Sequence, residues 1–284
     1  MNTSSGTNYK GIAREKLLGR YSTIIGAILV MQLIFCIVSY ITDRVVDDST
    51  IAGMIMYTAI AVIVGLIGAV FTVGELTMYM KLACGDEIRI RDIFSGFTGH
   101  PDKAIIIQFK IAVRCLIFLL PAIVIFGYTY YVSGGVKFTE GGGIAFDDTA
   151  LTGAGTPYIL LTVLAVIAGF TGAIYVRLKY AQCFYLMIDH PEYEAADVLD
   201  KSATIMKGHM WDYLYINLSF IPIMILGVLS LGVGLMYIQP YRGMTLTEYY
   251  MALASGEHNR GRNIDLIIDD ELTDSDDIKK GDSI

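Results

Sequence analysis

The chain has few charged residues for its length. Asp, Glu, Lys and Arg make up 17% of its 284 residues, against about 25% in soluble domains. Hydrophobic residues make up 54%, and the mean hydropathy is +0.55. This balance excludes a disordered chain, a basic nucleic-acid binder and an ordinary soluble enzyme, and it indicates a membrane protein.

Cysteine and histidine are also scarce, with four of each. The cysteines lie in or beside apolar stretches without CxxC spacing, which argues against both a disulfide framework and a zinc site. The histidines show no HExxH motif. The glycine clusters within 134–156 lack the Lys-Ser/Thr pair of a phosphate-binding loop. We therefore predict no metal ion, no cofactor and no catalytic residue.

Long uncharged stretches are present instead. About 20 apolar residues in a helix cross the hydrocarbon layer with every backbone group hydrogen-bonded inside the segment. Four stretches have that length: Tyr21–Thr42, Ile51–Gly74, Cys115–Val136 and Pro157–Val176. A fifth, Tyr213–Tyr241, is either one bent span or a broken hairpin, and its length favours a single crossing. We expect an all-α, polytopic transmembrane helix bundle with about five spans, or six if the last one is broken.

Basic residues are spread unevenly over the connections. Lys and Arg number four in each of segments 1–20, 81–104 and 177–209, and one in each of the two intervening connections. Positive residues are retained in the cytoplasm. We therefore expect a multi-pass protein of the cell membrane with a cytoplasmic N-terminus. The side of the C-terminal tail stays open, because five crossings place it outside and six place it inside.

Two of these connections show helical periodicity. Apolar residues recur at i, i+3, i+4 and i+7 near 88–98 and near 193–207, which predicts short amphipathic helices at the membrane surface. The chain is then divided into an amphipathic cytoplasmic segment 1–20, a transmembrane domain 21–241 with a Gly-rich extracytoplasmic loop 134–156, and a segment 242–284 that consists of a short amphipathic stretch and an acidic, disordered tail.

Several short motifs resemble a known family. They are Ala13-Arg14-Glu15-Lys16-Leu17, Asp92-Ile93-Phe94-Ser95-Gly96-Phe97, Tyr180-Ala181-Gln182, Asp189-His190-Pro191-Glu192, Met206-Lys207-Gly208, Leu218-Ser219-Phe220 and Pro240-Tyr241. With them the chain resembles the bacterial integral membrane family called domain of unknown function 975, which is distantly similar to the membrane region of some glycerophosphodiester phosphodiesterases. The resemblance implies a helical membrane module and supplies no catalytic residue.

Charged residues gather at the inner ends of three spans. Glu75 follows the second uncharged stretch, Lys110 and Arg114 precede the third, and Arg177 and Lys179 follow the fourth. They are either boundary residues whose side chains snorkel to water or a pocket for a lipid phosphate or another anion. The boundary interpretation is the simpler one, since none of the five interrupts an uncharged stretch. In a pocket, Glu75 would separate Lys110 from Arg114, which repel each other at i, i+4.

Glycine and proline predict a helix break in the last apolar stretch. Gly227, Gly232, Gly234 and Pro240 lie close together there, and broken helices at membrane depth usually line a cavity. Small residues in the earlier spans predict close helix packing within the chain.

The sequence favours a non-enzymatic module that binds membrane lipids, including anionic headgroups, or a membrane-protein partner, and that supports an envelope process. The first alternative is a transporter or channel for a small anion. The second is a membrane enzyme that acts on lipid headgroups. A nucleic-acid partner is not expected.

Overall fold

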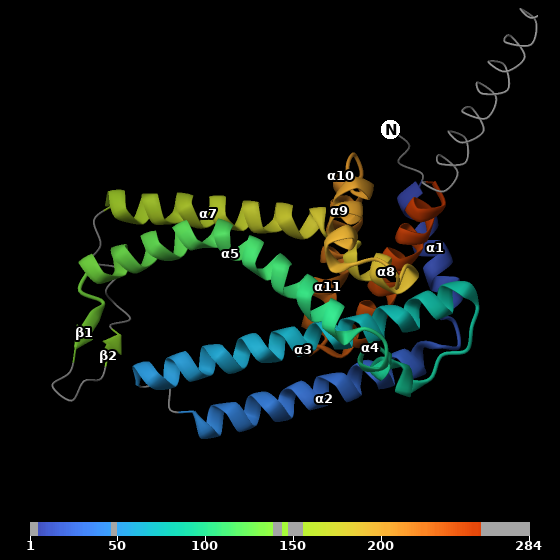
Figure 1. Ribbon diagram of the computed structural model, residues 1–284, viewed down its shortest axis with the longest axis horizontal. Coiled ribbons are helices and arrows are strands. Elements are labelled where there is room, and N and C mark those ends of the chain that lie inside the picture. Colours follow the sequence, from blue (N-terminus) through green and yellow to red (C-terminus); the bar gives the residue numbers. More distant parts are fainter. Residues whose placement is uncertain (1–4, 47–49, 139–143, 147–155, 257–284) are drawn as a thin grey trace, which may run out of the picture.

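The structure is a computed structural model that describes residues 5–46, 50–138, 144–146 and 156–256. Four long helices dominate it (Figure 1): α2 (Tyr21–Val45), α3 (Ile51–Cys84), α5 (Pro101–Val132) and α7 (Thr156–Lys179). The shorter helices are α1 (Ser5–Leu17), the 3₁₀ helix η1 (Ile90–Phe94), α4 (Ser95–Thr98), α8 (Cys183–Asp189), α9 (Ala195–Ile205), α10 (Met210–Leu218) and α11 (Ile221–Leu229). Residues 233–256 are also helical.

Five helical stretches are long and apolar enough to cross a membrane: Tyr21–Val45, Ala52–Cys84, Pro101–Val132, Pro157–Asp189 and Met210–Leu229. The predicted all-α, multi-pass fold is thereby confirmed. The helices run beyond the uncharged stretches, and α5 begins at Pro101 rather than at Cys115. Only the part of a helix inside hydrocarbon has to be apolar, so the hydropathy pattern marks that part and not the helix ends.

The four long helices form two pairs, α2 with α3 and α5 with α7. The pairs converge at the end where the short helices gather and diverge toward the other end (Figure 1). Close packing in the second pair involves Gly172, where an added β-carbon would collide with the Phe118 ring of α5. Lipid tails are as apolar as the side chains of the helices, so burying those side chains against each other gains little. Helices in a membrane therefore associate through close van der Waals packing of this kind.

A β-hairpin lies at the diverging end. Strand β1 (Val136–Phe138) pairs antiparallel with β2 (Ile144–Phe146). The predicted Gly-rich loop 134–156 therefore contains strands that the sequence did not reveal, because three residues are too few to show an alternating pattern. The rest of this loop, 139–143 and 147–155, and the predicted acidic tail from 257 onward lie outside the described residues.

The segment predicted as a surface helix near 88–98 forms η1 and α4, and it packs directly on α3. A β-carbon on Gly74 would collide with the carbonyl oxygen of Ile93, and one on Gly96 would collide with that of Val70. Ile93 is fully buried at this contact. The two backbones therefore touch at two points, and each point requires a residue without a side chain.

Asp92 fixes the start of η1. Its carboxylate accepts a hydrogen bond from the Arg89 backbone N–H at 2.9 Å and lies 3.3 Å from the Lys81 ammonium. Partial burial alone would raise the pKa of Asp92, but these two interactions outweigh it and hold the pKa below its ordinary value. The second predicted surface helix is present as α9, which buries Val198 and Leu199.

The last apolar stretch is not one continuous helix. Helix α11 ends at Leu229, and the chain then turns back into helix 233–256 through Leu231 and Gly232, whose φ angles are 57° and 83°. The Ser230 hydroxyl closes the turn by donating to the Gly227 carbonyl at 2.7 Å and accepting from the Gly234 N–H at 2.8 Å. Of the two alternatives that the sequence left open, the backbone follows the broken hairpin.

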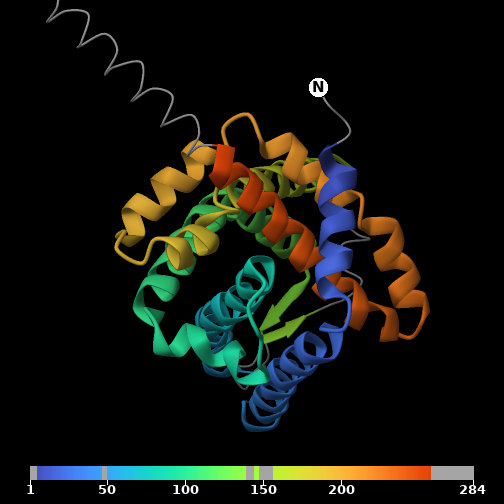
Figure 2. The ribbon, with the colours of Figure 1, turned by 90° about the vertical axis from the view of Figure 1, so that its right-hand side faces the viewer.

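The short helices form a layer across one end of the four long helices. Figure 2, which looks along the long helices, shows α10, α11 and the 233–256 helix extended across the view. The returning helix lies at the centre of this layer and contains the predicted break residue Pro240, which is buried. Residues 244–250 of this helix are all buried.

One ion pair ties the returning helix to the N-terminal helix. The Lys16 ammonium of α1 donates to the Glu248 carboxylate at 2.7 Å and to the Ala83 carbonyl of α3 at 2.8 Å. The Glu248 side chain is only 10% exposed, whereas that of Lys16 is 32% exposed. A single cation thus joins three segments that are distant in the sequence.

We expect Gly74→Ala to lower the free energy of unfolding by about 1–3 kcal/mol, the usual cost of overpacking, because the opposing atom is a backbone carbonyl that has little room to move. Gly65→Ala in the same helix is the matched control, since an added β-carbon there meets open space, and alanine favours the helix by about 0.5–1 kcal/mol. Denaturant titration in mild detergent measures both. Equal stability of the two variants would contradict the direct backbone contact.

We expect Glu248→Gln to lower the free energy of unfolding by about 1–2 kcal/mol, a charge-assisted hydrogen bond discounted for the exposure of Lys16. The control is Glu87→Gln, because Glu87 lies 3.9 Å from Arg89 in an exposed pair that contributes about 0–1 kcal/mol. The same titration compares the two. A smaller loss for Glu248→Gln than for Glu87→Gln would show that this tie is dispensable.

Candidate functional site

A pocket of about 450 Å³ lies where α5, α7, α8, α10 and the returning helix meet. Its walls are mostly apolar, with a few polar side chains, which is the usual composition of small-molecule sites. We call it the arginine pocket. Its lining residues are Gln108, Ile111, Ala112, Cys115, Ile174, Arg177, Leu178, Tyr180, Ala181, Phe184, Tyr213, Leu214, Asn217 and Arg242.

Arg242 is held in place by a side chain of α10. Its Nε and Nη2 atoms donate to the Asn217 carbonyl oxygen at 3.1 and 2.6 Å. The Asn217 amide in turn donates to the Tyr213 backbone carbonyl at 2.8 Å, which fixes its orientation. A guanidinium has five N–H donors, so three of those on Arg242 stay available to an acceptor in the pocket.

Arg177 enters the same pocket from the last turn of α7. It is exposed, and in the described part of the chain it forms no hydrogen bond or ion pair. Of the five charged residues predicted to form a site, Arg177 is the one that lines the pocket. Two guanidinium groups from distant parts of the sequence thus border one cavity.

Arg114 and Lys179 both lie against the Tyr180 ring. The Arg114 guanidinium carbon is 4.8 Å from the ring centroid, and the Lys179 ammonium is 5.6 Å from it. Cations are attracted to aromatic faces at such distances. Tyr180 is part of the pocket wall, but these two predicted residues are not among those that line the pocket. The buried Nη1 of Arg114 has no hydrogen-bond partner among the described residues.

Glu75 and Lys110 lie outside the arginine pocket. The Glu75 carboxylate accepts a hydrogen bond from the Tyr79 hydroxyl at 2.9 Å, and its cationic neighbour is Arg242. Among the described residues, Lys110 forms no hydrogen bond or ion pair. The structure therefore does not form the expected arrangement in which Glu75 separates Lys110 from Arg114.

Arg242 and Asn217 were missed by sequence reasoning. Arg242 ends the last apolar stretch, and nothing in its neighbours distinguishes it from a boundary residue. It reaches the pocket only because the chain turns back at Gly232. The glycine cluster predicted that the helix breaks. It did not predict that the helix after the break would bring Arg242 to a pocket.

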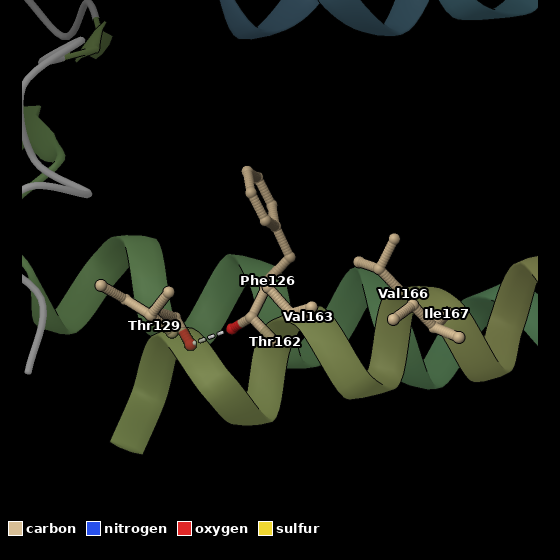
Figure 3. Close-up of a pocket in the computed structure, with 7 residues that line it drawn as sticks. Phe126, Thr129, Thr162, Val163, Val166 and Ile167 are labelled. Atoms are coloured by element: carbon tan, nitrogen blue, oxygen red, sulfur yellow. Dashed lines mark hydrogen bonds between the residues drawn. The ribbon is translucent and has the colours of Figure 1, made fainter. Parts of the chain in front are cut away.

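A second pocket, of about 310 Å³, lies on the α5 and α7 pair and is lined by Phe126, Thr129, Ile159, Thr162, Val163, Val166 and Ile167. Figure 3 shows the Thr129 and Thr162 hydroxyls facing one another, 2.9 Å apart, while Phe126 and Val166 project to one side of the pair. The hydroxyls satisfy each other, so this pocket offers apolar contact only. It suits an acyl chain better than a headgroup.

Metal ligands do not gather in the described ranges: no group of three or more His, Cys, Asp or Glu side chains lies close enough there to hold an ion. The polar groups that line the arginine pocket are Arg, Asn, Gln and Tyr side chains. These groups donate hydrogen bonds, and the two arginines add positive charge, so the pocket is suited to an anion.

Comparison with known proteins identifies one family. The family described as "Protein of unknown function (DUF975)" matches residues 1–257, a range that includes the whole arginine pocket. No curated protein and no solved structure matches the chain. The similarity to glycerophosphodiester phosphodiesterases therefore stays a prediction.

The two cysteines nearest the site provide a test of the pocket. Cys115 lines it, whereas Cys183 is 0% exposed. We expect N-ethylmaleimide to modify Cys115 in the folded protein and to leave Cys183 unmodified until the protein is denatured, with Cys84, which is exposed at the end of α3, as the positive control. Peptide mass spectrometry quantifies each site. Modification of Cys183 as fast as Cys115 would contradict the described packing.

Proposed function

The chain belongs to the DUF975 family, and we propose that it is a non-enzymatic membrane module that binds an anionic lipid headgroup in the arginine pocket. The observation that carries the proposal is the convergence of Arg177 and Arg242 on one cavity of about 450 Å³. Pockets that bind small molecules measure about 300–1,000 Å³, so the space suits a headgroup.

A phosphate group fits the chemistry of this pocket. Guanidinium groups bind phosphate oxygens through paired, charge-assisted hydrogen bonds. Arg242 offers donors that Asn217 leaves free, and Arg177 has no competing partner in the described chain. Basic pockets between helices near a membrane boundary are a known form of lipid recognition.

The described residues of the pocket wall include none of the commonest acid–base side chains, and this favours binding over catalysis. General acids and bases in enzymes are most often His, Glu or Asp. None of the described residues that line the pocket is one of these. Cys115 is the sole thiol among them, and no lining residue is suited to act as its base.

The basic segments of the chain indicate which side of the membrane the arginine pocket faces. The basic segments predicted to be cytoplasmic, which include α1 and α9, lie at the end that carries the arginine pocket (Figure 1). Under the positive-inside rule this end faces the cytoplasm. The ligand then comes from the cytoplasmic leaflet, where anionic lipids attract basic groups.

The proposal predicts that Arg177→Gln and Arg242→Gln each weaken binding of phosphatidylglycerol about ten- to hundredfold, because each removes charged hydrogen bonds of about 1.5–3 kcal/mol. Native mass spectrometry of lipid titrations measures this. Arg91→Gln is the control, since Arg91 is exposed and lies outside the pocket. Unchanged adducts in both variants would contradict the proposal.

A second measurement locates the bound lipid. Phosphatidylglycerol should slow the modification of Cys115 by N-ethylmaleimide relative to phosphatidylcholine, and Arg242→Gln should abolish the difference. Reconstituted vesicles also test the transport alternative, because a binding module leaves a chloride gradient intact. Vesicles that lose the gradient only when they contain the protein would favour a channel instead.

A further inference from the structure

We propose that the last apolar stretch, residues 210–241, does not cross the membrane but lies as a hairpin in one leaflet, on the same side as the N-terminus. The surface it presents fits the acyl chains of that leaflet. This inference is independent of the proposed lipid-headgroup site, because it depends on the chain topology and not on the pocket.

The ion pair of Lys16 fixes whether the number of crossings is even or odd. Lys16 precedes the first span, Ala83 ends the second, and Glu248 follows the last apolar stretch. The Lys16 ammonium bonds to both of the others, at 2.8 and 2.7 Å. Atoms in hydrogen-bond contact cannot lie on opposite sides of about 30 Å of hydrocarbon. An even number of crossings must therefore separate Ala83 from Glu248, and α5 and α7 supply two.

A second contact places the middle of this stretch near the N-terminal helix. Phe220 lies between α10 and α11, at the midpoint of the candidate span Met210–Leu229. The Lys10 ammonium lies 4.6 Å from the centroid of its ring. A crossing helix would carry Phe220 to the bilayer centre, where a lysine is expensive. Tyr9 makes a further ring contact with Tyr249, at 5.7 Å between centroids.

The direction of the hairpin agrees with this placement. Figure 2, which looks along the long helices, shows α10 and α11 lying in the plane of the view at the edge of the bundle, in a direction that crosses that of the long helices. The reversal at Ser230–Gly232 then brings the chain back across the same end. A helix in this direction lies in the plane of the membrane, as interfacial helices do.

The exposed surface of the hairpin is apolar. No charged residue occurs between Asp212 and Arg242. Near its tip Leu231 is 96% exposed, with Leu229 and Leu226 beside it. A patch of this kind marks contact with a membrane or partner. Lipid is the occupant we infer, because the patch continues the exposed apolar surface of the spans and aromatic residues flank it, namely Trp211, Tyr215 and Tyr237.

Trp211 is the one tryptophan of the chain, so its fluorescence reports depth without a label. Brominated phospholipids that carry bromine near the headgroup should quench it more than those with bromine deep in the acyl chain. The deciding variant is Leu218→Trp in a Trp211→Phe background. The hairpin predicts the same shallow profile for Leu218→Trp, whereas a crossing helix predicts maximal quenching by the deep bromine, and that result would overturn the proposal.

Cysteine labelling tests the topology separately. Ser255→Cys, Glu15→Cys and Asp43→Cys are introduced singly after the native cysteines are replaced, and all three positions are exposed. In sealed vesicles an impermeant maleimide should label Ser255→Cys and Glu15→Cys from the same side and Asp43→Cys from the other. Labelling of Ser255→Cys together with Asp43→Cys would overturn the proposal. If the cysteine-free chain does not fold, the quenching experiment decides alone.

Discussion

The Lys16 ammonium holds the basic end of the protein together. It joins the helix before the first span, the end of the second span and the helix that follows the last apolar stretch. An ammonium has three donors, and two of them are used here on segments whose buried residues Leu17, Met78 and Met244 also pack in one hydrophobic cluster. The returning helix, which also carries Arg242, is one of the segments joined here.

Cations at this end are held in two different ways. Some lie over aromatic rings, as Arg114 does over Tyr180 and Lys201 does over Tyr193, at 4.8 and 3.4 Å from the ring centroids. Such contacts stabilise the charge without an acid. Arg177 and Arg242 instead border open space. The aromatic residues thus keep the surrounding cations in place while the pocket arginines stay available.

Local patterns predicted the spans and the break in the last stretch, because each depends on residues close together in the sequence. The uncharged stretch from Ile51 to Gly74, for example, predicted a span although the helices that pack against it were not known. The surroundings of Glu75 could not be predicted in this way. Its neighbour Arg242 is far away in the sequence, and only the turn at Gly232 and the contact of Lys16 with Glu248 bring that arginine near.

The contact between α3 and the 90–98 segment has a genetic consequence. At Gly74 and Gly96 the opposing atoms are main-chain carbonyls, not side chains. A larger residue at either position therefore cannot be accommodated by trimming a side chain alone, because the nearest atom that it meets is a main-chain carbonyl oxygen. Second-site suppressors, which rescue most packing defects by changing a partner residue, are not available to this pair.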